Sequence, residues 1–249
     1  MTGEQPFPTG PGGEIGRRRG LKIPRRKVCR FESGPGHQAK RPFPLFQRFP
    51  GAQPRDPMPP LPSVTKAFLL ACVGAFCFFE LFPALAFWFE LWPLATGAFL
   101  PWQIVSYAFL HGDFTHLLFN MLGLWMFGGE LERVWGPRRY LQILVASTLS
   151  AAIVQLIFTW AIGSGAPTVG ASGAIFGLLL SFGMLFPNRI IVPLIPPIPM
   201  KAKYFVAIFG GLELILGFSR SSGIAHFAHL GGMLGAWLLI RHWRSPRRR

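Results

Sequence analysis

Six apolar segments follow one another after residue 63, and they restrict the possible folds more than any other feature of the chain. They lie near residues 64–86, 115–130, 139–162, 170–187, 203–219 and 224–241. Several approach the roughly 20 residues that a helix needs to cross a bilayer. Hydrophobic residues make up 51% of the chain and charged residues only 14%, which is unusual for a soluble domain. We therefore expect an all-α, polytopic membrane protein with six transmembrane helices.

The net charge of +15 could indicate a nucleic-acid partner, but the distribution of the basic residues argues against it. Thirteen of the 25 Lys and Arg residues lie in residues 1–66, and five lie in residues 241–249. If the N-terminus is inside, the internal segments carry 24 of them and the external loops carry only Arg220. Because positive charge accumulates in cytoplasmic loops, this predicts that both termini are inside. The bilayer, with its anionic headgroups, is then the expected partner.

Composition divides the chain into three parts. Residues 1–62 contain 13 Pro and 9 Gly, and we expect a disordered basic cytoplasmic segment. Residues 63–243 form the helical domain, and residues 244–249 a basic tail. The first apolar segment lies too far along the chain for a cleavable signal peptide. We expect a bacterial inner (plasma) membrane. A mitochondrial transit peptide is the alternative, against which the glutamates and prolines of the first segment count.

One serine lies in an unusual setting within the fourth segment. The stretch 168–177 reads Thr-Val-Gly-Ala-Ser-Gly-Ala-Ile-Phe-Gly and follows a loop marked by glycine and proline. A helix should begin near Gly170 or Ala171, with Ser172 in its first turn. There the hydroxyl lies beside free backbone N–H groups, which can stabilise an oxyanion. The alternative is that four residues, Gly170, Ser172, Gly173 and Gly177, form a small-residue face for helix packing.

Other polar residues lie where hydrocarbon is expected, and each such group is costly unless it has a partner or a function. His116 and Asn120 are four residues apart and share a helix face near the start of the second segment. His226 and His229 lie near the start of the sixth. In the predicted topology these residues and Ser172 share one depth, near the outer surface. Small-residue stripes on the fourth and sixth helices would bring His229 towards Ser172.

A serine beside an imidazole can act as a nucleophile. His116 and Asn120 could then donate hydrogen bonds to the developing oxyanion. Asp113 and Glu132 are candidates to orient His229 only by elimination, so a Ser–His dyad is the simpler interpretation.

Three motifs together resemble those of the rhomboid family of intramembrane serine proteases. They are His-x-x-x-Asn at 116–120, Gly-x-Ser-Gly at 170–173 and Ala-His-Leu-Gly-Gly at 228–232. The resemblance covers residues 64–241. It implies a six-helix rhomboid fold that cleaves single-span transmembrane substrates without a cofactor. It also implies that Ser172 is the nucleophile and His229 the base. His116 and Asn120 would form the oxyanion hole with the backbone N–H of Ser172.

The resemblance also suggests roles for the remaining residues. Glu132, in the segment 128–133, is expected to be structural. His226 is the rival base, but the family motif assigns that role to His229, so His226 and His111 become structural residues of the loops. Two positions depart from the family. Phe176 stands where a tyrosine often stacks on the catalytic histidine, and Trp102 is followed by glutamine instead of arginine.

Two alternatives belong to other functional classes. In the first, His111, His116, His226 and His229, with Asp113, ligate Zn²⁺ or Cu²⁺ in a transporter or metal site. That site would leave the setting of Ser172 unexplained. In the second, the chain is an inactive rhomboid that binds clients, which the intact serine and histidine argue against.

Overall fold

The structure is a computed structural model that describes residues 60–194, 196–217 and 226–245. The expectations for residues 1–59, for Arg220 and for residues 246–249 lie outside these residues. The described part is mostly helical, and its helices coincide with the six apolar segments. The principal helices are α1 (Ser63–Leu81), α4 (Phe114–Gly123), α5 (Gly129–Ile162), α6 (Ser172–Leu185), α7 (Ala202–Gly217) and α8 (His226–Arg244).

Short elements connect these helices. The connection between α1 and α4 contains α2 (Pro83–Ala86), η1 (Leu94–Thr96), α3 (Gln103–Ser106) and η2 (Tyr107–Phe109). A proline-rich connection leads from α6 to α7. It begins and ends in a two-stranded antiparallel ribbon, β1 (Ile190–Ile191) and β2 (Met200–Lys201), in which Ile190 pairs with Lys201.

The second and third apolar segments form one helical stretch with a break inside it. The stretch runs from α4 through a π-helical turn, η3 (Leu124–Gly128), into α5. Within α5, Gly136 has φ 76° and ψ 164°, a conformation that glycine adopts without strain. Pro137 follows, and proline is tolerated at the first position of a new helix because it has no N–H to satisfy. The two segments are therefore two helices that meet at Gly136.

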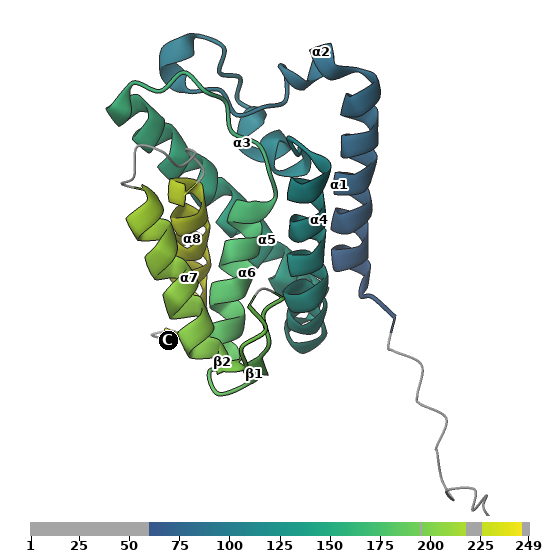
Figure 1. The fold of residues 1–249 in the computed structure, drawn as a ribbon, viewed down its shortest axis with the longest axis vertical. Helices are drawn as coiled ribbons and strands as arrows, with labels where there is room; N and C mark the ends of the chain where they lie inside the picture. Colours follow the sequence, from purple (N-terminus) through teal and green to yellow (C-terminus); the bar gives the residue numbers. More distant parts are fainter. Residues whose placement is uncertain (1–59, 195, 218–225, 246–249) are drawn as a thin grey trace, which may run out of the picture. The chain divides into compact units, whose positions relative to one another are not determined.

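Close packing of α5, α6 and α8 forms the centre of the bundle. Figure 1 shows α6 between α4 and the pair formed by α7 and α8. Glycine makes these approaches possible. A Cβ on Gly173 would lie 2.6 Å from the Cβ of Ala151, and one on Gly231 would lie 2.8 Å from Val154. Gly232 packs against the backbone of Gly173, so α6 and α8 meet where the small-residue stripes predicted.

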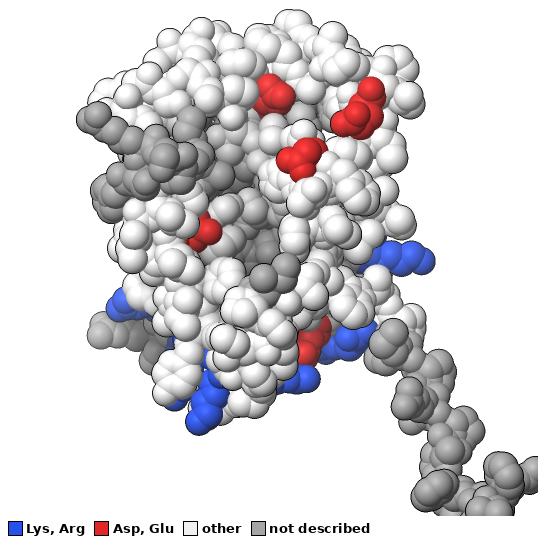
Figure 2. Space-filling view, in the orientation of Figure 1, with Lys and Arg blue, Asp and Glu red and all other residues white. Residues whose placement is uncertain are grey.

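The outer surface of the helices is apolar. Large side chains such as Trp160 and Ile215 are more than half exposed, as expected for a surface in contact with lipid. Within the described residues, two helical stretches are long and apolar enough to cross a membrane, Ser63–Leu81 and Phe114–Ile162. The helix Ser172–Leu185 is apolar but has only 14 residues. Figure 2 shows the basic side chains gathered at the end of the bundle that carries β1 and β2.

Candidate active site

The backbone before α6 is held in place so that Ser172 is the first residue of the helix. Thr168 pairs with Leu91 through two backbone hydrogen bonds of 3.0 Å, which attaches this segment to the loop between α1 and α4. The N–H of Gly170 donates to the carbonyl of Tyr107 at 2.9 Å. Gly170 has φ 124°, and a Cβ there would lie 2.8 Å from the ring of His116. Only glycine suits this position.

Ser172 and His229 are in direct contact. The Oγ of Ser172 lies 2.7 Å from Nε2 of His229, which α8 provides one turn after its first residue. The ring of Phe176 is stacked on the imidazole, with centroids 4.3 Å apart and planes 6° from parallel. The phenyl ring thus stacks on the histidine although it has no hydroxyl group. The imidazole is therefore held by the helix backbone, by Phe176 and by its contact with the serine.

His116 and Asn120 lie near the serine. Both line a cavity of about 370 Å³ together with Ser172, Phe176 and His229. Asn120 is buried, and its Nδ2 donates to the carbonyl of His116 at 2.8 Å. One amide hydrogen therefore remains to face the cavity. The structure brings together all four residues for which the sequence predicted a catalytic or oxyanion-binding position.

A carboxylate that the sequence analysis did not identify lies beside the histidine. Oε2 of Glu213, from α7, is 2.8 Å from Nδ1 of His229 and 2.5 Å from Nδ1 of His226. The sequence analysis considered only Asp113 and Glu132 for a position beside His229, and the structure places Glu213 there instead. The detectable feature was a carboxylate in the apolar segment 203–219, since a charge there requires a partner.

The two acidic residues considered by elimination have other positions. Oδ1 of Asp113 accepts a hydrogen bond of 2.8 Å from the N–H of His116 and so caps α4. Glu132 is buried and accepts hydrogen bonds from the first turn of α1, including the N–H groups of Val64 and Thr65. Glu132 therefore connects α5 to α1, in agreement with a structural function.

The remaining predicted residues are distributed around the site. His226 contacts Glu213 instead of packing in a loop. His111 is buried, and its ring lies edge-on to that of His116 at 5.2 Å. Burial, together with the neighbouring His116, lowers the pKa of His111 to about 4. His111 is therefore neutral at neutral pH and packs beside the site as an uncharged ring.

Gln103, the position that departs from the family, organises the loop between α1 and α4. Its side chain is fully buried, and Oε1 accepts from the N–H groups of Trp92 and Leu100 at 3.3 and 3.1 Å. Its Nε2 donates to the carbonyls of Trp88 and Ala98. An amide, which both donates and accepts, can therefore hold this loop together without an arginine.

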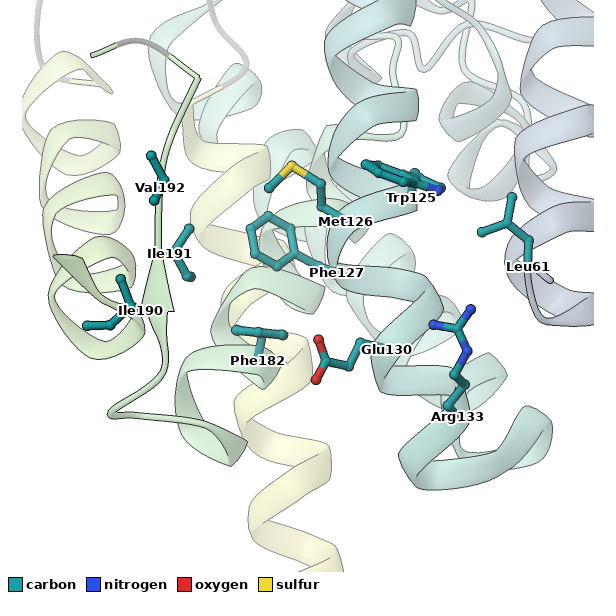
Figure 3. Close-up of a pocket in the computed structure, with 10 residues that line it drawn as sticks. All are labelled: Leu61, Trp125, Met126, Phe127, Glu130, Arg133, Phe182, Ile190, Ile191 and Val192. Carbon is teal, nitrogen blue, oxygen red and sulfur yellow. The ribbon is translucent and has the colours of Figure 1, made fainter. Parts of the chain in front are cut away.

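A larger cavity of about 590 Å³ is lined by residues near β1 and by Glu130 and Arg133 (Figure 3). Apart from these two residues its lining is apolar, with Trp125, Phe127 and Ile191 among the side chains. Its lining includes neither Ser172 nor His229. Of these two cavities, the smaller one therefore contains the contact between Ser172 and His229.

A serine hydroxyl in contact with an imidazole, at the start of a helix and inside a helical bundle, has the elements of a serine hydrolase site. The "Rhomboid domain" family matches residues 98–244, which is more than half of the chain. The chain belongs to the rhomboid family, and it is a membrane protein.

Named relatives come from mitochondria and from bacteria. The chain is 32% identical over 149 residues to "Rhomboid protein 1, mitochondrial" of Saccharomyces cerevisiae, covering 57% of this chain and 42% of that protein. It is 35% identical over 133 residues to "Putative rhomboid protease YdcA" of Bacillus subtilis, covering 52% and 61%. It is 28% identical over 153 residues to "Rhomboid protease AarA" of Providencia stuartii, covering 55% and 54%. The chain thus spans less than two thirds of the length of each of these relatives.

Proposed function

We propose that the chain is an intramembrane serine endopeptidase that hydrolyses peptide bonds of transmembrane proteins. The observation that carries this proposal is the contact of 2.7 Å between Oγ of Ser172 and Nε2 of His229 at the start of α6. Membership of the rhomboid family supports it, since relatives in that family bear the name of protease.

Ser172 is the nucleophile and His229 is the general base in this proposal. Oγ attacks the carbonyl carbon of the scissile bond while Nε2 of His229 takes the hydroxyl proton. The resulting imidazolium gives that proton to the leaving amine as the C–N bond breaks, and an acyl ester on Ser172 remains. Water, deprotonated by the same nitrogen, then hydrolyses the ester and regenerates the serine.

The charge that develops on the carbonyl oxygen needs hydrogen-bond donors that are already in place. We assign this function to the backbone N–H of Ser172, the free amide hydrogen of Asn120 and the imidazole of His116. Their shared cavity supports the assignment. The helix dipole of α6 adds partial positive charge at the same point.

We further propose that α1, α4, α5, α6, α7 and α8 all cross the membrane, with both termini inside. The family match and the basic side chains at one end of the bundle support this arrangement. Residues 63–243 would form the protease domain, flanked inside by residues 1–62 and 244–249. We place it in a bacterial inner membrane, although relatives occur in mitochondria as well.

The proposed substrates are single-span proteins with helix-destabilising residues near the outer end of the span. A helix hides its carbonyls in hydrogen bonds, so a segment with Gly or Pro unwinds more readily into the site. No cofactor, metal or nucleic acid takes part in this scheme, and lipid is the other partner.

The test uses the purified full-length chain in liposomes with such a substrate. We expect cleavage by the wild type, complete loss in Ser172→Ala and His229→Ala, and labelling of Ser172 alone by a fluorophosphonate probe. Full activity of Ser172→Ala would refute the proposal. Activity that a chelator abolishes and Zn²⁺ restores would favour a metal enzyme. Stable capture of the substrate without any cleavage would favour a client-binding protein.

A further inference from the structure

We propose that Glu213 is a positioning residue for His229, so that Glu213, His229 and Ser172 act together as a triad. His226 supports the carboxylate of Glu213. The inference rests on the proposed function and deepens it. Glu213 is provided by α7, whereas both histidines begin α8, three residues apart on one face of that helix. The carboxylate therefore joins two helices at the reacting base.

The contacts identify one oxygen of Glu213 as the centre of this cluster. Oε2 meets the Nδ1 atoms of His226 and His229 at 2.5 and 2.8 Å. The three side chains are only 17%, 14% and 13% exposed for His226, His229 and Glu213. The contact between Nδ1 of His226 and Oε2 of Glu213 has the geometry of a hydrogen bond. Nδ1 of His229 is close to the same oxygen but lacks that geometry. His226 thus holds the carboxylate, and the carboxylate faces His229.

The same three residues could in principle ligate a metal ion, since their donor atoms lie within 4.8 Å of one another. Their separations argue for hydrogen bonding instead. Ligands at about 2.0–2.1 Å from a tetrahedral Zn²⁺ lie ~3.3 Å from one another. The separations of 2.5 and 2.8 Å around Oε2 are shorter than this. The first is that of a hydrogen bond from His226, and the second is that of a close contact with His229.

A carboxylate at Nδ1 acts on the base in two ways. It favours the tautomer with the hydrogen on Nδ1, which leaves the lone pair of Nε2 to accept the proton of Ser172. It also stabilises the imidazolium that forms during attack, because opposite charges interact strongly where water is scarce. Both effects act on the chemical step and leave the binding of the substrate unchanged, so they should appear in kcat and not in KM.

Phe176 and Ser172 hold His229 from the side of α6, and Glu213 adds a contact from the side of α7. Removal of Glu213 therefore leaves the serine and the imidazole in contact but without control of the tautomer. Loss of the corresponding carboxylate in soluble serine proteases costs about 10⁴-fold in kcat. Because the alignment at His229 is imperfect, we expect a loss of about 10²-fold or more here.

The experiment compares Glu213→Gln and Glu213→Asp with Glu80→Gln, which neutralises an exposed carboxylate on α1. Each full-length variant is measured in liposomes for kcat and KM on a single-span substrate, and for the rate of fluorophosphonate labelling. We expect Glu213→Gln to lower kcat and the labelling rate about 10²-fold with KM within about twofold, and Glu213→Asp to recover part of the loss. Glu80→Gln should match the wild type.

A second readout does not depend on activity. In the wild type Oε2 of Glu213 lies 2.8 Å from Nδ1 of His229, so the Nδ1 proton resonance of His229 should lie further downfield than in Glu213→Gln, while the unfolding midpoint stays unchanged. The inference is overturned if Glu213→Gln keeps kcat within about twofold, or if the Gln and Asp variants lose kcat equally along with their unfolding midpoint. If the wild type itself neither cleaves nor reacts at Ser172, it is the proposed function that fails.

Discussion

Replacing Glu132 by glutamine changes one oxygen to an amide nitrogen, and the structure leaves no harmless place for that nitrogen. Oε1 accepts from the N–H of Val64 at 2.9 Å, and Oε2 accepts from the N–H and the hydroxyl of Thr65 at 2.7 and 2.8 Å. Whichever way the amide is turned, its NH₂ group faces a backbone N–H. One donor in the first turn of α1 must lose its acceptor.

The cost follows from these contacts. A hydrogen bond to a charged group contributes about 1.5–3 kcal/mol, and a buried donor without a partner costs about 1–3 kcal/mol. Glu132→Gln should therefore lower the free energy of unfolding by about 3–5 kcal/mol, although the side chain keeps its shape. The neighbouring Glu130→Gln is the matched control. Its partner Arg189 is 52% exposed, so the change should stay within about 1 kcal/mol.

The assay is unfolding in mixed micelles of increasing sodium dodecyl sulfate content, followed by tryptophan fluorescence. Glu132→Gln should unfold at a clearly lower content than the wild type, and Glu130→Gln near the wild type. At low content, where both variants are folded, each should still label at Ser172. Coincident unfolding midpoints for the two variants would refute the reasoning.

Three further changes test other contacts. Phe176→Leu removes a stacked ring worth about 0.5–1.5 kcal/mol and should lower kcat several-fold, whereas Phe176→Tyr keeps it and should retain activity; equal kcat values would contradict this. Gln103→Ala leaves the partly buried N–H groups of Trp92 and Leu100 without acceptors, so limited proteolysis should cut the loop between α1 and α4 sooner than in the wild type. The folded state resists protonation of His111, whose pKa is about 4, while the unfolded chain takes up that proton near pH 6.5. Stability should therefore fall as the pH drops through this range, and less steeply in His111→Asn when thermal unfolding is compared at pH 7 and pH 4.5.

The helices could be predicted well because hydrophobic length and glycine–proline boundaries are local properties of the chain. Ser172 begins α6, close to where the loop residues 163–167 predicted a helix start. The approach of His229 to Ser172 followed from small-residue stripes, since contacts between glycine backbones leave little freedom in how two helices meet.

The acidic partner of the site could not be predicted in the same way. A carboxylate within an apolar helix can face lipid headgroups, another helix or a cavity, and only the rotation of α7 about its axis decides among them. Asp113 and Glu132 were candidates only by elimination. Both instead accept hydrogen bonds from backbone N–H groups in the first turn of a helix, Asp113 in α4 and Glu132 in α1. These N–H groups have no acceptor within their own helix and need one from a nearby side chain.

α7 packs against both α8 and α6, and it carries Glu213. Ser172 and His229 lie on the central helices α6 and α8, whereas Glu213 lies on α7. A sideways displacement of α7 would therefore withdraw the carboxylate while Ser172 and His229 stayed in place. In the proposed protease, such a displacement would lower the rate of the reaction without removing Ser172.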